Sequence, residues 1–500
     1  MAERVLGIDL GTSAVKVALV DRQGAVLAGE REPYPMYDDT PGAMEQEPRD
    51  WTRALAAAVH RLGARSDLGR VGAIGLAGQL PTLTRVRDGE PHGRAVTWLD
   101  GRADAWTRRR LGPGRRENFY RRTGMPLDGR YIGPMYAYHG GREADRTDRV
   151  MSAKDYLYLW LTGEARTDPA TAAGYGAWDL TEGRWLGAAL TLWSLDAAQL
   201  PAVVTGRAAF APLRAESADD LGLPRGVPVH VGSADSLAAV VGAGAFGPRS
   251  LAMVFGSSTA LVGSVDAPVL DGGARYLVTP HALPGRFAVE SDLLATGAAL
   301  DWLASLAGWA PGRLVTAAGL APLGAAGVRF APYLAGAEQG GLWRTDVAGA
   351  VLGLTTSHTL AHLGRALLEG IAFETRRSLE LLAEPMGGVD EVVVLGLGDG
   401  DWFAAALADV VGRAVVHVPG SLTAARGAAL LTGETDFAPD EARPIRASAG
   451  PGVAAHPPTA AGSALYEGLY REHLRLFPRR AATGRGGVIR KPDGRTGAGT

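Results

Sequence analysis

The sequence contains no cysteine, so it offers no disulfide, no thiolate metal ligand and no cysteine nucleophile. Neither charge is in excess, since 51 Lys and Arg residues stand against 53 Asp and Glu residues, which argues against a nucleic-acid partner. Apolar runs such as residues 237–246 are too short and too rich in glycine to cross a bilayer. A β-prone run begins at Val5 and leaves no room for a signal peptide. We therefore expect a cytoplasmic protein with no membrane partner.

Several well-known ligand motifs are also missing. No Gly-x-x-x-x-Gly-Lys-Ser/Thr sequence is present, which argues against a P-loop kinase. The glycines at 396–400 do not follow the Gly-x-Gly-x-x-Gly spacing of a dinucleotide fold. The ten histidines show no His-Glu-x-x-His pattern. His358 and His362 are four residues apart, but they bracket a helix start without a third ligand, so we interpret them as surface or capping residues.

The chain has 500 residues, 46% of them hydrophobic and 21% charged, which is typical of a globular protein with two or more domains. Amphipathic helices are predicted over 51–62 and 360–382. A helical run is also predicted over 402–411, with another over 465–474 near the end of the chain. The segment 447–458, rich in Pro, Gly and Ala, is interpreted as a linker, and the last twenty or so residues as disordered.

The most informative segment is the hairpin predicted over 5–21. Two apolar strands flank a turn that contains Gly11, Thr12 and Ser13, and Asp9 lies near the end of the first strand. A small turn of this kind lets backbone N–H groups and hydroxyls approach phosphate oxygens closely. The Asp9 carboxylate could hold a metal-bound water. The hairpin therefore predicts a phosphate site.

The same order of strands and glycine-containing turns occurs twice in the chain. Residues 251–262 again contain a strand, a glycine followed by hydroxyl residues, and a strand. The apolar strand at 71–78 has a counterpart at 392–399, and both run into glycines. Two repeats in the same order predict two related α/β domains that face each other across a cleft.

Asp235 follows the apolar strand 227–234 and precedes a predicted helix. A carboxylate at the carboxyl end of a strand lies where open α/β sheets bind ligands, and it could accept a proton from a substrate hydroxyl. An N-cap for the helix near Ser236 is the alternative. Trp98, Asp100 and Arg102 could likewise face a polyhydroxylated ligand or form an ordinary surface ion pair.

Taken together, these motifs resemble the FGGY family of carbohydrate kinases, and within it the xylulokinase branch. The resemblance covers nearly the whole chain up to the terminal helix. The motifs that carry it are residues 7–13, 75–79, 98–102, 154–157, 161–164, the Asp235 segment, 353–355 and 365–373.

The resemblance implies a fold of two ribonuclease-H-like α/β domains, as in actin, hexokinase and heat-shock ATPases, flanking a nucleotide cleft. The expected boundaries are 1–245 for the sugar and phosphate side, 246–445 for the nucleotide side, and 446–500 for the linker, terminal helix and tail. ATP and Mg²⁺ are the implied cofactors, a small sugar is the implied partner, and a homodimer is the candidate assembly.

The resemblance also implies a role for each site residue. Asp235 is the expected catalytic base, and Asp9 is expected to hold the metal through water. The phosphate and Mg²⁺ region is expected to comprise Asp9, Gly11, Thr12 and Ser13. The nucleotide is expected to lie against Gly256, Ser257, Gly297, Asp301, Gly396 and Gly400. The substrate is expected to meet Gln79, Leu80, Pro81, Trp98, Asp100, Arg102, Asp235 and Glu338.

The sequence departs from the xylulokinase pattern on the sugar side. Leu80 and Pro81 stand where Met-His is usual, which removes a hydrogen-bond donor for a sugar hydroxyl. In the loop at 337–341, only Glu338 matches the usual Gly-Glu-Arg-Thr-Pro sequence.

The leading expectation is phosphorylation of D-xylulose to D-xylulose 5-phosphate by ATP. A kinase for another ketose, polyol or aldonate, such as ribulose, erythritol, glycerol or gluconate, is the alternative within the class. A nucleotide-binding switch that phosphorylates no sugar is the alternative from another class.

Overall fold

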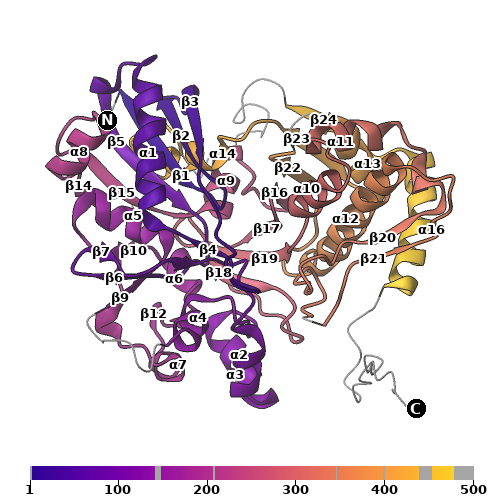
Figure 1. Cartoon of the computed structure of the whole chain (residues 1–500), viewed down its shortest axis with the longest axis horizontal. Helices are drawn as coiled ribbons and strands as arrows, with labels where there is room; N and C mark the ends of the chain where they lie inside the picture. The colour runs from indigo at the N-terminus through magenta and orange to yellow at the C-terminus, as the bar shows by residue number, and fades with distance from the viewer. Residues whose placement is uncertain are drawn as a thin grey trace, which may run out of the picture.

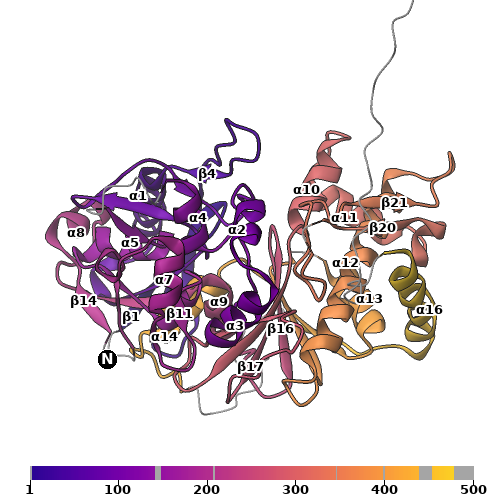
Figure 2. The same ribbon diagram turned by 90° about the horizontal axis from the view of Figure 1, so that it is seen from below.

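The computed structural model describes residues 3–140, 148–205, 209–344, 346–397, 400–438 and 453–477. Two bodies, each built on a large sheet, stand side by side (Figure 1). The same division is visible after a quarter turn, with the strands β16 (Ser250–Phe255) and β17 (Thr259–Val265) between the two bodies (Figure 2). None of the helices in the described part of the chain is long and apolar enough to cross a membrane.

The first sheet has six strands in the order β14-β15-β5-β1-β2-β3. Their bounds are β1 Arg4–Leu10, β2 Ala14–Asp21, β3 Val26–Pro33, β5 Val71–Gly78, β14 Phe210–Pro212 and β15 Pro228–Ala234. Strands β1, β2 and β3 form antiparallel pairs, whereas β5 pairs in parallel with both β1 and β15. The β1–β2 register places Asp9 directly opposite Lys16.

The second sheet repeats this topology. Its order is β18-β19-β17-β16-β22-β23-β24, with β18 Leu277–Pro280, β19 Phe287–Leu293, β22 Glu391–Leu395, β23 Ala414–Val418 and β24 Ala454–His456. Here β16 pairs antiparallel with β17 and in parallel with β22, as β1 does with β2 and β5. The predicted correspondence between the two hairpins is confirmed. Strand 71–78 (β5) and the strand predicted from residue 392, which is β22, also occupy corresponding positions in the two sheets.

Helices cover the sheets. The first body carries α1 Pro48–Gly63, α5 Ala153–Thr162 and α8 Ala215–Leu221, and the second carries α10 Gly297–Ser305, α11 Pro311–Leu320, α12 Leu360–Leu382, α13 Asp401–Val411 and α16 Ala460–Leu476. The four predicted helices correspond to α1, α12, α13 and α16. The capping interpretation of His362 is confirmed, because its ring forms a capping box with Thr359 at the start of α12.

A further small region is attached to the first body. It contains α2 Asp104–Arg110, α3 Pro113–Thr123, α4 Ile132–Tyr138, α6 Pro169–Ala173 and α7 Gly187–Trp193. The short strands outside the two sheets are β4 Glu45–Gln46, β6 Thr84–Arg87, β7 Glu90–Pro91, β8 Ala95–Val96, β9 Arg149–Met151, β10 Arg166–Thr167, β11 Trp178–Asp179, β12 Arg184–Trp185, β13 Ala202–Val203, β20 Arg329–Ala331 and β21 Ala350–Leu352. Helices α3, α4 and α7 share one core, which includes Phe119, Ile132 and Trp193.

Two helices connect the bodies. Helix α9 (Asp235–Ala243) follows the first sheet, yet its Val240 and Val241 pack with strand residues of the second sheet. Helix α14 (Thr423–Leu431) follows the second sheet, yet its alanines pack against β1, β2 and β5 of the first. The two helices contact each other so closely that a Cβ atom on Gly427 would lie 1.7 Å from the Ala238 carbonyl oxygen. Each body therefore has one helix, α9 or α14, that packs against the sheet of the other body.

Some sequence predictions fall wholly or partly outside the described residues. These are the linker segment up to residue 452, the disordered tail, and Gly398 and Asp399 in the glycine-rich turn.

Candidate active site

A cleft of about 300 Å³ is lined by residues of both sheets. Two sets of its lining residues differ in where they come from, and Asp235 and Trp98 also line the cleft outside both sets. The hairpin group comes from the two hairpins and consists of Asp9, Gly11, Thr12, Ser13, Lys16, Gly256, Ser257 and Ser258. The mixed group comes from scattered elements and consists of Leu80, Pro81, Met125, Arg130, Tyr131, Gly174, Leu277, Thr279, Glu290, Asp292, Leu294 and Gln339.

The first hairpin turn is held by hydrogen bonds from several sides. The Gly11 N–H donates to the Ala14 carbonyl over 3.1 Å, and the Tyr34 hydroxyl donates to the Gly11 carbonyl. The Gln46 side-chain amide donates to the Thr12 carbonyl over 2.6 Å. With these carbonyls engaged, the turn keeps its shape and the hydroxyl side chains of Thr12 and Ser13 line the cleft.

Asp9 is almost fully buried, with 1% of its surface exposed. Its Oδ2 lies 3.0 Å from the Lys16 Nζ, and this carboxylate raises the pKa of the Lys16 ammonium group. Its Oδ1 is buried and has no hydrogen-bond partner among the described residues. A buried carboxylate oxygen without a partner is costly, so this atom is positioned for a ligand that the cleft binds.

The second turn repeats the first with one residue fewer between the paired strand ends. The Gly256 N–H donates to the Ser258 carbonyl over 2.8 Å. Two other predicted glycines lie directly behind this strand and turn. The Gly297 N–H donates to the Gly256 carbonyl over 2.9 Å, and a Cβ on Gly396 would lie 2.4 Å from the Phe255 carbonyl oxygen. These glycines allow close backbone approach at the turn.

Asp235 lines the cleft at the start of α9. The helix begins at Asp235 itself, with Ala234 in the N-cap position, so the capping alternative is wrong. Burial and, after it, the nearby Asp9 carboxylate raise the pKa of the Asp235 carboxyl to about 7, although Lys16 acts to lower it. Glu290 of the mixed group also interacts electrostatically with Asp235. Asp235 therefore lies where the two groups meet.

The structure divides the residues predicted to bind the substrate. Leu80, Pro81 and Trp98 line the cleft, and the Trp98 Nε1–H donates to the Thr12 Oγ1 over 3.0 Å. Gln79 is buried behind the lining, where its amide donates to the Gln46 Oε1 over 2.8 Å.

Three further predicted residues lie behind the described lining. Arg102 forms an ion pair with Asp100, its Nε lying 2.9 Å from Oδ2, and a second ion pair with Glu45. Glu338 accepts hydrogen bonds from the backbone N–H groups of Gln339 and Gly340, and burial raises its pKa to about 8. These contacts shape the segments that carry Trp98 and Gln339.

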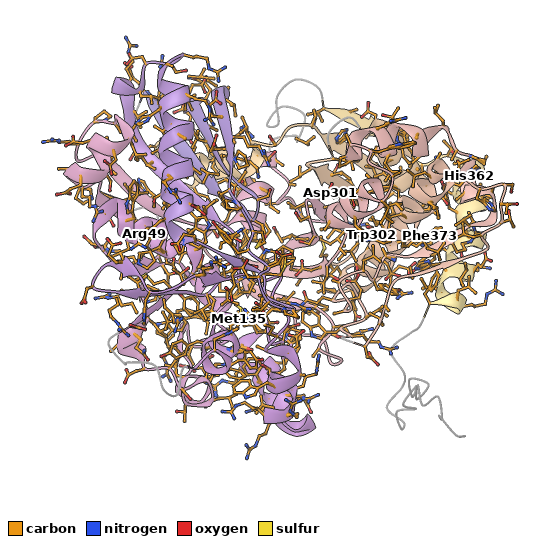
Figure 3. The ribbon with its side chains drawn as sticks, viewed as in Figure 1. Arg49, Met135, Asp301, Trp302, His362 and Phe373 are labelled. Carbon is orange, nitrogen blue, oxygen red and sulfur yellow. The ribbon has the colours of Figure 1, made fainter. Side chains whose placement is uncertain are left out.

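The remaining predicted nucleotide residues lie on the second body, outside the described lining of the cleft. Asp301 lies on α10, where its side chain is exposed (Figure 3). Gly400 occupies the N-cap position of α13. Among the described residues, no cluster of three His, Cys, Asp or Glu side chains could hold a metal on its own.

Four charged residues of the cleft lining were not predicted from the sequence: Lys16, Arg130, Glu290 and Asp292. Lys16 could have been found from the hairpin register, since strands joined by this turn pair it with Asp9. Glu290 and Asp292 also left a signal, because acids two residues apart in an apolar strand lie on the same face. Arg130 left no local signal, since it follows α3 in an irregular segment and its place depends on the tertiary structure.

Comparisons with known proteins agree over most of the chain. Residues 4–242 match the model of the N-terminal domain of the FGGY family of carbohydrate kinases, and residues 251–434 match that of the C-terminal domain. A xylulose kinase of Escherichia coli (strain K12) is 31% identical over 434 residues, which is 85% of this chain and 89% of the relative.

Solved structures extend the comparison. Ligand-bound xylulose kinase from Lactobacillus acidophilus superposes with a TM-score of 0.83 at 23% identity, covering 95% of this chain and 97% of that one. Gluconate kinase from the same organism gives a TM-score of 0.83 and 23% identity, covering 95% and 98%. At this identity both show the shared fold alone. The family models and the E. coli relative establish that this chain belongs to the FGGY family of carbohydrate kinases and is a sugar phosphotransferase.

Proposed function

We propose that this kinase transfers the γ-phosphoryl group of ATP to a hydroxyl of D-xylulose and forms D-xylulose 5-phosphate. The relative at 31% identity is a xylulose kinase, which supports this substrate. The observation that carries the mechanism is Asp235, a carboxylate with a pKa raised to about 7 at the junction of the hairpin and mixed groups.

Asp235 acts as the general base in this proposal. In its deprotonated form it accepts the proton of the sugar hydroxyl while the hydroxyl oxygen attacks the γ-phosphorus in line with the departing ADP. A base with a pKa near neutrality is partly deprotonated at physiological pH and still a good proton acceptor. Burial, the first cause of the raised pKa, thus tunes Asp235 for this step.

The hairpin group binds the phosphates in this proposal. Thr12, Ser13 and Ser257 provide hydroxyl donors, and the small turns allow backbone N–H groups to approach phosphate oxygens. Asp9 offers the carboxylate oxygens that Mg²⁺ prefers, and its Oδ1 has no partner among the described residues. Bound Mg²⁺ would neutralise phosphate charge, held by this carboxylate, directly or through water, together with the phosphates.

The units 1–245 and 246–445 close on each other around the substrates in this proposal. Closure would exclude water, which otherwise competes with the sugar hydroxyl for the phosphoryl group. Because α9 begins with Asp235 and packs against the second sheet, a movement between the bodies would also move the base.

A polyol is the second candidate substrate. Leu80 and Pro81 line the cleft, and neither side chain carries a polar group. Without the hydrogen-bond donor of the usual Met-His pattern, this surface offers no side-chain partner to a sugar carbonyl, and a polyol has no carbonyl.

A coupled ADP-release assay across pentuloses, hexuloses, polyols and gluconate tests the proposal. We expect D-xylulose to give the highest kcat/KM. In Asp235→Asn, kcat should fall by about 10²- to 10⁴-fold while ATP binding persists, because the variant removes the base and leaves the hairpin turns in place.

The exposed Asp266 gives a matched control, since Asp266→Asn removes a carboxylate that is not part of the described cleft lining. If no sugar or polyol stimulates ADP release in the parent enzyme, the kinase proposal fails and a nucleotide-binding switch is favoured. Preference for another ketose or a polyol would overturn only the D-xylulose assignment.

A further inference from the structure

Two acidic side chains in the cleft have no role in the mechanism above. Glu290 and Asp292 are two residues apart on β19, so they lie on the same face of the strand, and both line the cleft. Ser291 between them points to the other face, where its hydroxyl lies 3.1 Å from that of Ser378 on α12. The strand thus presents both carboxyl groups to the substrates.

The two carboxyl groups are hydrogen-bonded to each other. Burial raises the pKa of Glu290 well above its usual value and that of Asp292 to about 7, and their mutual contact raises the pKa of Glu290 further. Two carboxyl groups in contact share a proton, because they cannot both ionise without strong repulsion. The pair therefore offers both a donor and acceptors.

The cations among the described lining residues are already engaged. Lys16 is bound to Asp9. Arg130 lies 3.4 Å from an oxygen of Asp128 and 3.3 Å from one of Asp104, so its charge is paired with these carboxyl groups. Asp235 and the Glu290–Asp292 pair thus give this part of the cleft an excess of negative charge.

The cleft also carries an independent sign that a ligand binds there. Oδ1 of Asp9 is buried, and none of the described residues hydrogen-bonds to it. The acidic pair is therefore part of a binding cleft and not an isolated surface cluster.

From this arrangement we infer that Glu290 and Asp292 select the substrate by charge, so that the kinase accepts neutral ketoses and polyols and rejects aldonates. The inference rests on the proposed kinase function and names its substrate class. Hydroxyl groups can both donate to and accept from a carboxyl pair that shares one proton. A substrate carboxylate would instead meet Asp235 and the pair with no free cation among the described lining residues.

The expected discrimination is large. At an effective dielectric constant of about 20, one like charge about 6 Å away lowers affinity by about 100-fold. We therefore expect kcat/KM for D-xylulose to exceed that for D-gluconate by about 100-fold or more.

The experiment measures kcat/KM for D-xylulose, xylitol and D-gluconate in the parent and in the double variant Glu290→Gln, Asp292→Asn, which removes the one negative charge that the pair shares. Calorimetric titration of the same three compounds without nucleotide gives a second readout that needs no turnover. Glu391→Gln is the matched control, because Glu391 begins β22 of the same sheet and is absent from the described lining. Circular dichroism and ATP binding verify that each variant folds.

We expect the double variant to raise the ratio of D-gluconate to D-xylulose kcat/KM by about 10-fold or more, and Glu391→Gln to leave it unchanged. The inference is overturned if the parent prefers D-gluconate, or if the folded double variant keeps the parent ratio.

Failure of the kinase function gives a different result. Suppose that no compound stimulates ADP release but the neutral compounds bind more tightly than D-gluconate. If the double variant reduces that difference in affinity, the proposed function fails and the charge selection stands. If none of the three compounds binds, both are overturned.

Discussion

The hairpin group and the mixed group line the same cleft but are assembled differently. Each half of the hairpin group is continuous in sequence, and a single turn fixes the relative positions of Gly11, Thr12 and Ser13. The mixed group takes its members from loops and strands spread between Leu80 and Gln339. One group depends on local geometry, whereas the other depends on how the whole chain packs.

This difference separates what the two groups can do. A local turn that supplies hydroxyls and N–H groups suits the phosphates, which are the same whichever sugar is used. The mixed group can change one side chain at a time without disturbing that turn. In the proposed function its polar members therefore select the substrate, while the hairpin group and Asp235 carry out the phosphoryl transfer.

The largest effect is expected where helices α9 and α14 connect the two bodies. Gly427→Ala would place a Cβ atom 1.7 Å from the Ala238 carbonyl oxygen, so α9 and α14 would have to separate. Forced overpacking of this kind costs about 3 kcal/mol. We expect a clear fall in the denaturation midpoint, with weaker binding of both ATP and sugar, because α9 carries Asp235 and packs on both bodies.

Gly468→Ala provides the matched control. Gly468 is exposed on α16, and an added Cβ there meets nothing within 4 Å. Alanine should stabilise this helix by about 0.5–1 kcal/mol, so the two glycine substitutions should change stability in opposite directions. Equal effects would contradict the close packing of the helix pair.

The next effect is the pH dependence of kcat/KM. With a pKa of about 7 for Asp235, the basic form falls about tenfold for each pH unit below 7, so activity at pH 5 should be about 100-fold below the plateau. Asp9, Lys16 and Glu290 are the charged or titratable neighbours that act on it. A pH–rate profile with D-xylulose measures the acid limb.

Lys16→Met sharpens this test. Lys16 lowers the pKa of Asp235, so its removal should move the acid limb to higher pH. Arg225→Gln removes an exposed cation that pairs with Asp219 and should leave the limb in place. A limb that does not move in Lys16→Met would show that another group controls the rate.

The sequence predicted the hairpin group better than the mixed group for a physical reason. Strand, turn and hydroxyl signals lie within a few residues, so the site at Gly11 to Ser13 and its repeat at Gly256 could be located, and the two-sheet fold followed from their order. Lys16 was missed although the turn fixes its register opposite Asp9.

The mixed group needs information that no short segment contains. Gln79, Asp100 and Arg102 belong to recognisable motifs, yet their polar groups are engaged with Gln46, Glu45 and each other behind the lining. Motifs mark residues that a fold requires, and they do not distinguish those that touch a ligand from those that support them. The spacing of Glu290 and Asp292 shows only that they share one face of a strand, whereas the position of β19 in the sheet makes that face part of the cleft.

The smallest effect is expected at Trp98, which lines the cleft but belongs to neither the hairpin group nor the mixed group. Its indole N–H donates to the Thr12 hydroxyl, so it links the 98–102 segment to the first phosphate turn. Trp98→Phe keeps an aromatic ring and removes this hydrogen bond, which contributes about 1 kcal/mol. If Trp98 mainly orders the turn, KM for ATP should rise about 5-fold with KM for D-xylulose nearly constant. A rise confined to the sugar KM would instead assign Trp98 to the mixed group. Trp309 lies on the second body, outside the described lining. Trp309→Phe should therefore change neither KM, which would show that the effect of Trp98→Phe depends on the position of Trp98 and not on the loss of any indole.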